Sequence, residues 1–411
     1  MTKPARSPIV LIRTTMFSAA VMFALLAAGG TMQAQTFSLL HTFTGGNDGA
    51  TPLAGLTLDR GGNLYGTAYG GGVNSPAGTV FKLKPAGSGW ILTPLYEFSD
   101  SGDGGANPSG GVVFGPDGAL YGTASGGSGF GTVFKLQPTQ SACKAALCYW
   151  TQTVLYRFTA SGDGHQPTGN LMFDQAGNIY GTTQAGGAFG YGTVYKLTNS
   201  GGQWSESVLY SFMGGSDGNQ PTDGVVMDGA GNLYGTTPYG GINNCQGGCG
   251  VVFELTPSGA GWTEQVLYHF LGLPDAQRPY AGLTIDSAGN LYGASYEGGQ
   301  NSGGTVFLLS PSGGGWNYSV LYNLPGSQNG PFARLTRDAA GNLYGATIIP
   351  STIFELTPSN GSWIYSDLHD FSGNDGLYPR GSVTLDGQGN LYGTTSAGGA
   401  DSQGTAWKLA P

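Results

Sequence analysis

The chain has 411 residues, of which 77 are Gly, 12% are aromatic and only 9% are charged. Gly does not recur at every third position, which excludes collagen, and the many aromatic residues provide too much apolar surface for a disordered chain. The formal net charge is −9. An acidic chain of this kind is a poor partner for nucleic acid, because phosphate binding needs clustered Lys and Arg.

The N-terminus has the pattern of a secretory signal peptide. Lys3, Arg6 and Arg13 precede an apolar stretch from Met16 to Ala28, and small residues continue to Ala34. We expect residues 1–34 to be removed, which leaves 12 basic and 24 acidic residues and a net charge of −12. A retained membrane anchor is the alternative, but the apolar run is shorter than about 18 residues. The mature chain has no later segment that could span a bilayer, so we expect a secreted protein, extracellular or periplasmic.

One sequence unit, Asn-Leu-Tyr-Gly-Thr-Thr or a close variant, occurs seven times. Its copies centre on Tyr65, Tyr121, Tyr180, Tyr234, Tyr292, Tyr344 and Tyr392. A repeat of about 50 residues holds four short strands with their turns, which is the size of one propeller blade. The mature chain therefore reads as one domain, residues 35–411, made of seven repeats.

The fourth copy illustrates the expected strands. Residues 224–228 and 232–237 form a hairpin through an Asp-x-x-Gly-Asn turn, and residues 251–255 form the third strand. The fourth strand begins at Trp262. Its alternation predicts that Trp262, Val266, Tyr268 and Phe270 share one face. The neighbouring copies have the same spacing, and we interpret this stripe of aromatic and apolar side chains as the surface through which one blade packs against the next.

The two ends of the repeat region predict how the ring closes. The last copy ends after its third strand, residues 405–409, and lacks a fourth. Residues 37–43 have the pattern of a fourth strand but follow no other repeat. We therefore expect an all-β fold, a seven-bladed β-propeller with four-stranded blades, in which the N-terminal strand completes the last blade.

Two recurring elements resemble a known repeat. Asn390–Thr395 and Gly131–Leu136, with the Gly-Gly loops between such elements, are similar to the bacterial GloVer-type tandem repeat, and the resemblance covers essentially the whole mature chain. It implies a secreted or surface-displayed repeat protein. It implies no established activity and no catalytic residues.

The four cysteines form two close pairs. In an exported protein Cys143 and Cys148, and Cys245 and Cys249, are expected to form disulfides. The first pair lies in a loop between strands three and four and the second in a loop between strands two and three. These loops lie on opposite faces of an up-and-down blade, so a disulfide can form only within each loop and not between the two loops.

An acidic residue recurs in the loop that leads from strand four to the next strand one. These residues are Asp48, Asp103, Asp163, Asp217, Asp275 and Asp375. We interpret each as a turn residue that hydrogen-bonds its own backbone. The alternative is a ring of carboxylates that holds Ca²⁺. No other metal or cofactor is expected.

The same loops are asymmetric at their proline. The residue after this proline is small or uncharged in the first four blades, but in blades five to seven it is Tyr280, Phe332 or Arg380. Arg278, Arg334 and Tyr378 lie nearby. Arginine with aromatic rings suits carboxylates, sulfates or sugar faces, so these six residues form the candidate ligand-binding site. The alternative is that the arginines only pair with neighbouring acidic loops.

Three functions fit this sequence. The first is a non-enzymatic binding or scaffold module, which fits seven regular blades without a catalytic constellation. We expect such a module to be a monomer that binds a glycan, an anionic ligand or a protein through one face. The second is a hydrolase or lyase that acts on extracellular polysaccharide, an analogy at the level of fold only. The third is a purely structural envelope protein.

Overall fold

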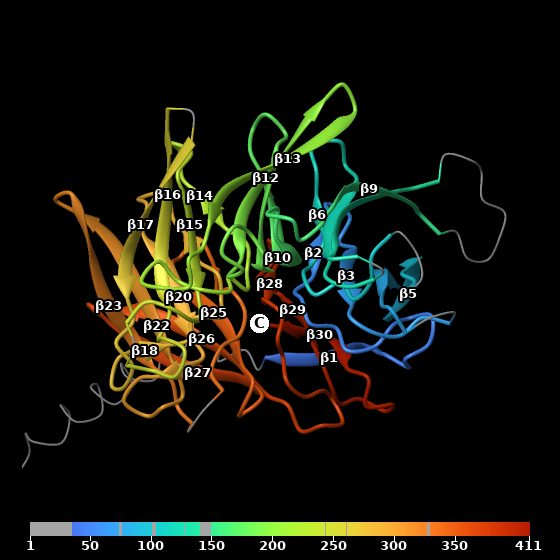
Figure 1. Ribbon diagram of the computed structural model, residues 1–411. Helices are drawn as coiled ribbons and strands as arrows, with labels where there is room; N and C mark the ends of the chain where they lie inside the picture. Colours follow the sequence, from blue (N-terminus) through green and yellow to red (C-terminus); the bar gives the residue numbers. More distant parts are fainter. Residues whose placement is uncertain are drawn as a thin grey trace, which may run out of the picture. The chain divides into compact units, whose positions relative to one another are not determined.

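Four antiparallel strands that follow one another in sequence form the repeating unit of the structure. The computed structural model describes residues 35–73, 76–100, 104–127, 129–139, 149–242, 244–259, 261–326 and 329–411. Residues Phe37–Ala410 form one compact unit. Its seven four-stranded sheets are the blades of a ring, so the predicted seven-bladed β-propeller is confirmed (Figure 1). The expected signal peptide, residues 1–34, lies outside the described residues.

The strands occupy equivalent places in the seven blades. The innermost strands are short in every blade except the third: β2 (Thr57–Leu58), β6 (Val113–Phe114), β10 (His165–Phe173), β14 (Val226–Met227), β19 (Thr284–Ile285), β24 (Thr336–Arg337) and β28 (Thr384–Leu385). The second strands are β3 (Leu64–Ala68), β7 (Leu120–Ala124), β11 (Ile179–Ala185), β15 (Leu233–Thr237), β20 (Leu291–Ser295), β25 (Leu343–Thr347) and β29 (Leu391–Thr395). The third strands are β4 (Thr79–Ala86), β8 (Thr132–Gln137), β12 (Thr193–Ser200), β16 (Val251–Ser258), β22 (Thr305–Ser312), β26 (Thr352–Ser359) and β30 (Thr405–Ala410). The outer strands are β5 (Gly89–Glu97), β9 (Thr151–Arg157), β13 (Gln203–Ser211), β17 (Gly261–His269), β23 (Gly315–Asn323), β27 (Ser362–Asp370) and β1 (Thr36–Thr42).

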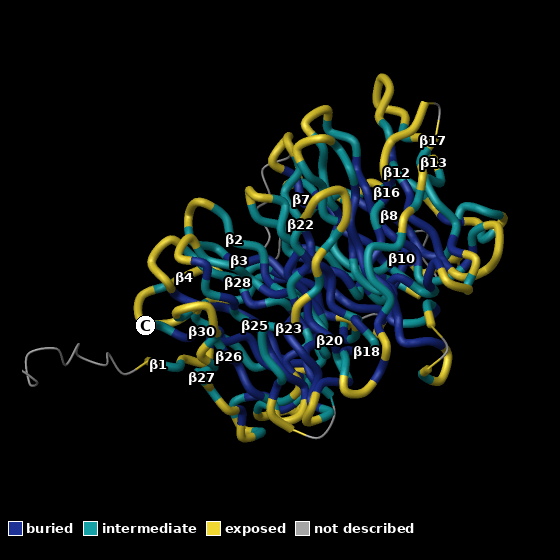
Figure 2. The backbone as a smooth tube through the Cα atoms, turned by 90° about the vertical axis from the view of Figure 1, so that its left-hand side faces the viewer, coloured by how far each residue is buried: buried dark blue, intermediate teal, exposed yellow. Residues whose placement is uncertain are grey.

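One side of the ring carries two sets of loops, and we call it the loop face. It holds the loops from strand two to strand three and the loops from each outer strand to the next blade. The two sets pair with each other, as in the bridge between Ala50 and Gly70 and in the small sheet of β18 (Ala276–Gln277) and β21 (Glu297–Gly298). The hairpins between strands one and two lie at the other end of the blades. Figure 2 shows that the exposed segments gather in such connections, while the strands between them are largely buried.

The Asp-x-x-Gly-Asn turn closes the inner hairpin as the sequence predicted. In blade four the Oδ1 atom of Asp228 accepts hydrogen bonds from the backbone N–H groups of Ala230 and Asn232, both at 2.9 Å. Its Oδ2 atom accepts from the Asn232 side chain at 2.9 Å and from the Tyr234 hydroxyl at 3.0 Å. Burial alone would raise the pKa of Asp228, but these donors outweigh it and lower the pKa. The repeated Tyr thus ties strand two to its own turn.

The Gly that follows this Tyr makes room for an aromatic ring from strand three. A Cβ atom at Gly235 would lie 2.5 Å from the Phe253 ring, and one at Gly393 would lie 2.4 Å from the Trp407 ring. Both aromatic side chains are almost completely buried. The Tyr-Gly-Thr motif therefore records a packing requirement, because any larger residue would displace the ring that fills the blade.

The prediction that the outer-strand stripe lies on one face is wrong. A bulge at Leu267 shifts the register, since Val252 pairs with Tyr268 whereas Phe253 pairs with Val266. Adjacent residues of β16 point to opposite faces, so Val266 and Tyr268 do too. The same shift occurs in β5, β9, β13, β23 and β27. The large apolar side chains at the beginning of each of these strands therefore face one neighbouring blade, and those near its end face the other.

The ring closes by the predicted route. Strand β1 completes the last blade in the order β1-β30-β29-β28, and Figure 1 shows it beside β30. Hydroxyl groups of blade seven also donate to the backbone of blade one, from Thr384 to the carbonyl of Leu56 and from Thr394 to that of Ala54. The first and last blades are thereby joined by the same kind of bond that joins blade five to blade six, where Thr284 donates to Leu335.

Two acidic side chains occupy unusual places between the outer strands. The residue two positions after the outer-strand Trp faces the Tyr of the preceding outer strand. At this position Tyr318 donates to Asp275 at 2.9 Å, and Gln152 accepts from Tyr96 at 2.8 Å. Glu206 and Glu264 stand there in blades three and four, and the Oε1 atom of each is buried without a described hydrogen-bond partner.

The surroundings of these two carboxyl groups favour their neutral form. Burial, followed by the nearby charge of Asp163, raises the pKa of Glu206 to about 7. Burial and Asp217 raise the pKa of Glu264 to about 7 in the same way. The same aspartates also accept hydrogen bonds from tyrosine hydroxyls: Tyr156 donates to Asp163, and Tyr210 donates to Asp217. Glu206 and Glu264 are therefore each buried between two outer strands in a place that favours the protonated carboxyl group over the carboxylate.

The closing strand gives the first test of the fold. A chain that begins at Thr44 lacks β1 and the fully buried Phe43, and it leaves β30 as an open edge. Losing the burial of Phe43 and Leu40 alone should cost about 3–6 kcal/mol, so we expect a large fall in the thermal unfolding midpoint or aggregation. A chain that begins at Gln35 is the control. Equal unfolding midpoints for the two chains would show that β1 does not close the ring.

The buried glutamates predict how stability depends on pH. A carboxyl whose pKa is raised on folding binds its proton more tightly in the native state, so stability should fall between about pH 4.5 and 7 as the pH rises. The double variant Glu206→Gln, Glu264→Gln should lose this dependence. It should be more stable than the parent at pH 8 by about 1–2 kcal/mol per site, discounted for partial solvent access. The measurement is urea unfolding at pH 5 and pH 8.

The comparison of the two pH values also separates this effect from that of the hairpin aspartates. The pKa is lowered for six of these aspartates, so their contribution is lost only below about pH 4: Asp59, Asp117, Asp174, Asp228, Asp286 and Asp386. A variant that is equally more stable at pH 5 and pH 8 would show a packing effect and would contradict the assignment of a proton to these sites.

Candidate functional site

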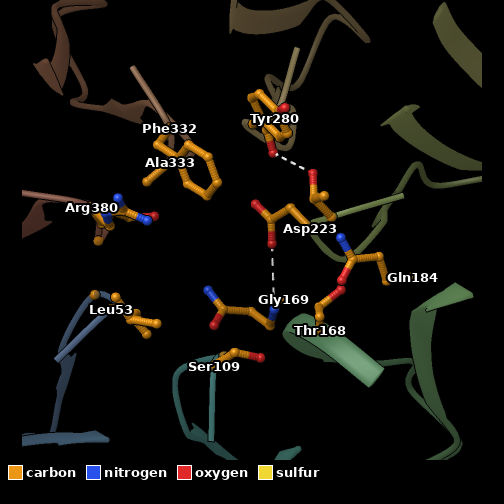
Figure 3. A pocket seen from close by; sticks show the side chains of 17 residues that line it. Leu53, Ser109, Thr168, Gly169, Gln184, Asp223, Tyr280, Phe332, Ala333 and Arg380 are labelled. Carbon is orange, nitrogen blue, oxygen red and sulfur yellow. Dashed lines mark hydrogen bonds between the residues drawn. The ribbon is translucent and has the colours of Figure 1, made fainter. Parts of the chain in front are cut away.

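The residues that follow the loop proline meet at the mouth of the central channel on the loop face. They are contributed by all seven blades and line one pocket of about 190 Å³ (Figure 3): Leu53, Ser109, Thr168, Thr222, Tyr280, Phe332 and Arg380. The residue before the proline has a positive φ in blades one to five and in blade seven, for example Thr51 and Asn107. This turn sends the chain from the outer edge back to the axis and places the next side chain at the mouth.

The side of the pocket formed by blades five to seven is aromatic and cationic. Tyr280 and Phe332 stack with their ring centroids 4.8 Å apart and their planes 18° apart. The guanidinium carbon of Arg380 lies 5.5 Å from the Phe332 ring centroid, in cation–π range. Tyr296 meets both rings edge-on. No carboxylate of a described residue lies within ion-pair distance of Arg380.

The opposite side, from blades two to four, is polar and includes one carboxylate, that of Asp223. The hydroxyl of Ser109 is buried and has no described hydrogen-bond partner. The hydroxyl of Thr222 donates to the Tyr280 carbonyl at 2.9 Å. Asn170 accepts from the backbone of Gly111 at 2.9 Å through its side-chain oxygen. Its side-chain N–H₂ donates to no other described residue, so this wall presents the Asn170 side chain to a ligand.

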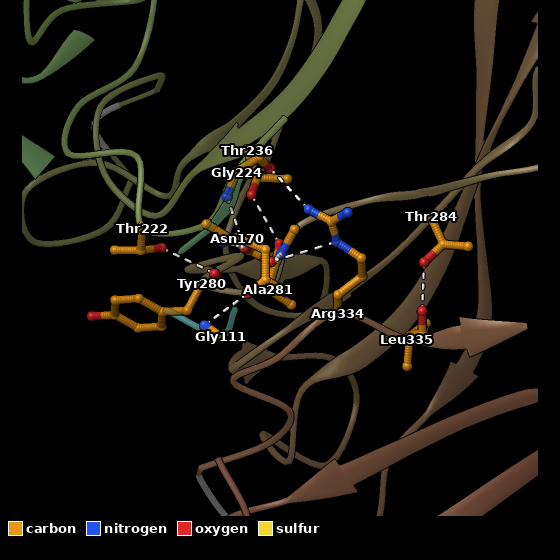
Figure 4. A network of polar contacts seen from close by, with 12 residues as sticks. Gly111, Asn170, Thr222, Gly224, Thr236, Tyr280, Ala281, Thr284, Arg334 and Leu335 are labelled. Atoms are coloured by element: carbon orange, nitrogen blue, oxygen red, sulfur yellow. Dashed lines mark hydrogen bonds and ion pairs between the residues drawn. The ribbon is translucent and has the colours of Figure 1, made fainter. Parts of the chain in front are cut away.

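A polar network supports the pocket from one step further along the inner strands (Figure 4). Asp223, which lines the pocket, accepts hydrogen bonds from the backbone of Gly224 at 2.7 Å and of Gly282 at 3.1 Å. Arg334 reaches from blade six to blade four, where it lies 3.6 Å from the Asp223 carboxylate and donates to the Gly224 carbonyl at 3.0 Å. The charge of Asp223 is therefore compensated by Arg334 inside the protein.

The six residues predicted from the sequence do not all reach the pocket. Tyr280, Phe332 and Arg380 line it, whereas Arg278, Arg334 and Tyr378 are absent from its wall. Arg278 pairs with Glu297 at 3.0 Å and lies over the Tyr239 ring. Tyr378 is 38% exposed on the loop face. Two of the three arginines thus have carboxylate partners, as the alternative interpretation expected, and Arg380 does not.

Sequence reasoning missed the contributions of Ser109, Asn170 and Asp223. A signal for two of them was present. The position two residues after the mouth residue is Gly in blades one, two, four and five, but Asn170, Arg334 and Ser382 replace it in the other blades. Asp223 similarly replaces a small residue one position earlier. Of the larger residues at these crowded positions, Asn170, Asp223 and Ser382 line the pocket, whereas Arg334 does not.

The titratable groups that line the pocket are poorly suited to acid–base catalysis. They are Asp223, Tyr280 and Arg380. Burial, followed by a hydrogen bond between its hydroxyl and that of Tyr239 at 2.6 Å, raises the pKa of Tyr280, which keeps it protonated near neutral pH. The described part of the pocket wall contains no His, Glu or Cys.

The recurring loop aspartates act as turn residues wherever they are described. Asp217 accepts from the backbone of Met213 at 2.7 Å and from the Tyr210 hydroxyl at 3.0 Å, and Asp48, Asp163, Asp275 and Asp375 are held in the same way, with His41 or His369 in place of Tyr in two blades. Asp103 lies outside the described residues. Within the described part of the chain, no three potential metal-ligating side chains cluster. Ca²⁺ binding stays a prediction.

The cysteine prediction is confirmed for one pair. Cys245 and Cys249 form a disulfide in the loop between β15 and β16, on the loop face. Cys143 and Cys148 lie outside the described residues, so their pairing stays a prediction.

The loop face also carries most of the exposed apolar side chains. Eleven of the sixteen large hydrophobic residues that are exposed in the described chain belong to its loops: Tyr69, Val73, Phe130, Phe189, Tyr191, Met213, Ile242, Leu271, Leu273, Ile349 and Tyr378. Single exposed apolar residues are ordinary, but their concentration on one face is typical of an interaction surface.

Comparison with protein families agrees with this architecture. The model of the Gloeobacter/Verrucomicrobia repeat matches residues 26–151, 147–349 and 243–411. The chain belongs to this repeat family. The resemblance seen in the sequence is thereby confirmed over the whole ring of this Gloeobacter/Verrucomicrobia repeat protein. A search of curated proteins finds no match to the sequence.

Solved structures similar to this repeat protein share its fold. Virginiamycin B lyase from Staphylococcus aureus is 15% identical with a TM-score of 0.55, and the match covers 92% of this chain and 99% of that one. A proposed 6-phosphogluconolactonase from Bacteroides uniformis is 13% identical with a TM-score of 0.51, and the match covers 84% and 93%. At these identities the likeness establishes the propeller fold alone.

Among the described residues, no helix is long and apolar enough to cross a membrane.

Proposed function

We propose that this chain is a non-enzymatic binding module whose ligand occupies the mouth pocket on the loop face. The observation that carries the proposal is the asymmetry of seven equivalent positions. Four of them hold Leu, Ser or Thr, and the other three hold Tyr280, Phe332 and Arg380. A ring that needed only stability would have no use for a cation without a carboxylate partner at its axis.

The surroundings of the pocket support binding over chemistry. Arg380 is held against Phe332, and Asp223 is held by backbone N–H groups and Arg334. Neither group has the environment of a general base, because the guanidinium of Arg380 only donates hydrogen bonds and the Asp223 carboxylate already accepts them from the backbone beside Arg334. The exposed apolar residues of the loop face provide a wider contact surface for a larger molecule to which the ligand is attached.

Secretion is part of this proposal. A signal peptide at residues 1–34, a disulfide and an acidic mature chain are together compatible with an extracellular or periplasmic protein. Binding to external glycans or small acids is a role open to a protein in that location.

A binding screen with matched variants tests the proposed function. The purified chain from residue 35 is screened by thermal shift against neutral sugars, acidic sugars and small carboxylic acids, and hits are measured by calorimetry. Arg380→Ala should weaken binding about 10- to 100-fold, because this is the loss of affinity expected when one charge-assisted hydrogen bond is removed. Arg60→Ala, an exposed arginine in a hairpin at the other end of the blades, should bind like the parent.

Two results would contradict the proposal. Equal binding by both variants would place the ligand away from the mouth pocket. Conversion of a hit into product by the parent chain would show that the protein is an enzyme.

A further inference from the structure

We infer that the ligand of the mouth pocket is a sugar residue that carries one carboxylate, such as a uronic acid. This inference rests on the proposed function and assigns the class of ligand to its site. It follows from four features of the pocket: its charge, its apolar wall, its polar wall and its size.

The charge of the pocket favours a single anionic group. Asp223 and Arg334 compensate each other, which leaves Arg380 as the uncompensated charge on the described wall. One guanidinium offers a planar pair of N–H donors that matches a carboxylate. A phosphate monoester would bring up to two negative charges near neutral pH and would leave one of them unmatched beside Asp223.

The apolar wall suits the C–H face of a sugar ring. Phe332 projects into the pocket next to Arg380, as Figure 3 shows, and Tyr280 stacks behind it. A ligand whose carboxylate meets Arg380 therefore has an aromatic surface directly beside that anchor. Small dicarboxylic acids would leave this surface without a contact.

The polar wall suits the hydroxyl groups of the same ring. Asn170 has a side-chain N–H₂ that donates to no other described residue, and the side chain of Gln184, which also lines the pocket, adds a neutral donor and acceptor at the same side. An aromatic acid without hydroxyl groups would leave both side chains without a hydrogen bond to the ligand.

The size of the pocket limits the ligand to one ring. Its volume of about 190 Å³ is below the roughly 300–1,000 Å³ of sites for drug-sized ligands. One monosaccharide unit is of this order, and a longer chain would continue onto the apolar loop face.

Matched pairs of sugars test this inference. Calorimetry at low salt compares D-glucuronate with D-glucose and D-galacturonate with D-galactose, so that each pair differs only by the carboxylate. At least one acid should bind 10-fold or more tightly than its neutral partner. Arg380→Gln should remove that difference, and Arg60→Gln should retain it. Ser109→Ala should retain the preference for the acid, because Arg380 sets it.

The possible outcomes separate the ligand class from the binding function. If neutral and acidic sugars bind equally well through the mouth pocket, the function stands and the carboxylate inference is wrong. The same conclusion follows if the sugars fail but another class of compound binds in a manner that depends on Arg380. If no compound binds in that manner, the proposed function itself is contradicted.

Discussion

The close approach of the inner strands at the ring axis is the constraint on which the rest of the structure depends. A Cβ atom at Gly110 would lie 2.1 Å from the carbonyl oxygen of Gly169, and one at Gly224 would lie 2.0 Å from that of Asn170. Gly381 meets the backbone of Ala54 just as closely, at 2.4 Å, where the last blade meets the first. Neighbouring backbones are therefore in van der Waals contact around the axis. Seven blades fit into one ring because glycine occupies these positions, and the hydroxyl-to-carbonyl bonds between blades become possible at that distance.

The same constraint decides where function can reside. Most blades have Gly or Ala at the crowded level, so the residue after the loop proline is the one that varies most at the mouth. Blades one to four use this position for small or uncharged residues, and blades five to seven use it for two aromatic rings and Arg380. Arg334 breaks the glycine rule, but Asp223 of blade four receives it, which keeps the axis neutral and leaves the charge of Arg380 for a ligand.

The features that the sequence predicted correctly are those that depend on local chemistry or on counting. The seven Tyr-Gly-Thr units, the Asp228 hairpin turn and the closing strand at Phe37 all follow from residues that act near their own position. The outer-strand stripe failed because a bulge at Leu267 is invisible to a parity rule. The pairing of Arg334 with Asp223, which are 111 residues apart, depends on which blades adjoin and how far a side chain reaches across the axis. Sequence patterns therefore located the mouth and three of the residues that line it, while the structure was needed to tell the arginines with a carboxylate partner from Arg380.

A crystal structure of the chain from residue 35 soaked with D-glucuronate would test most directly that the asymmetric mouth is the binding site. The account predicts the ligand in the pocket between Ser109 and Phe332, with its carboxylate at about 2.7–2.9 Å from the guanidinium nitrogens of Arg380. The groove between blades seven and one, lined by Trp90 and Arg60 on the opposite side of the ring, is the competing hollow. Ligand bound there, with the mouth pocket unoccupied, would contradict the account.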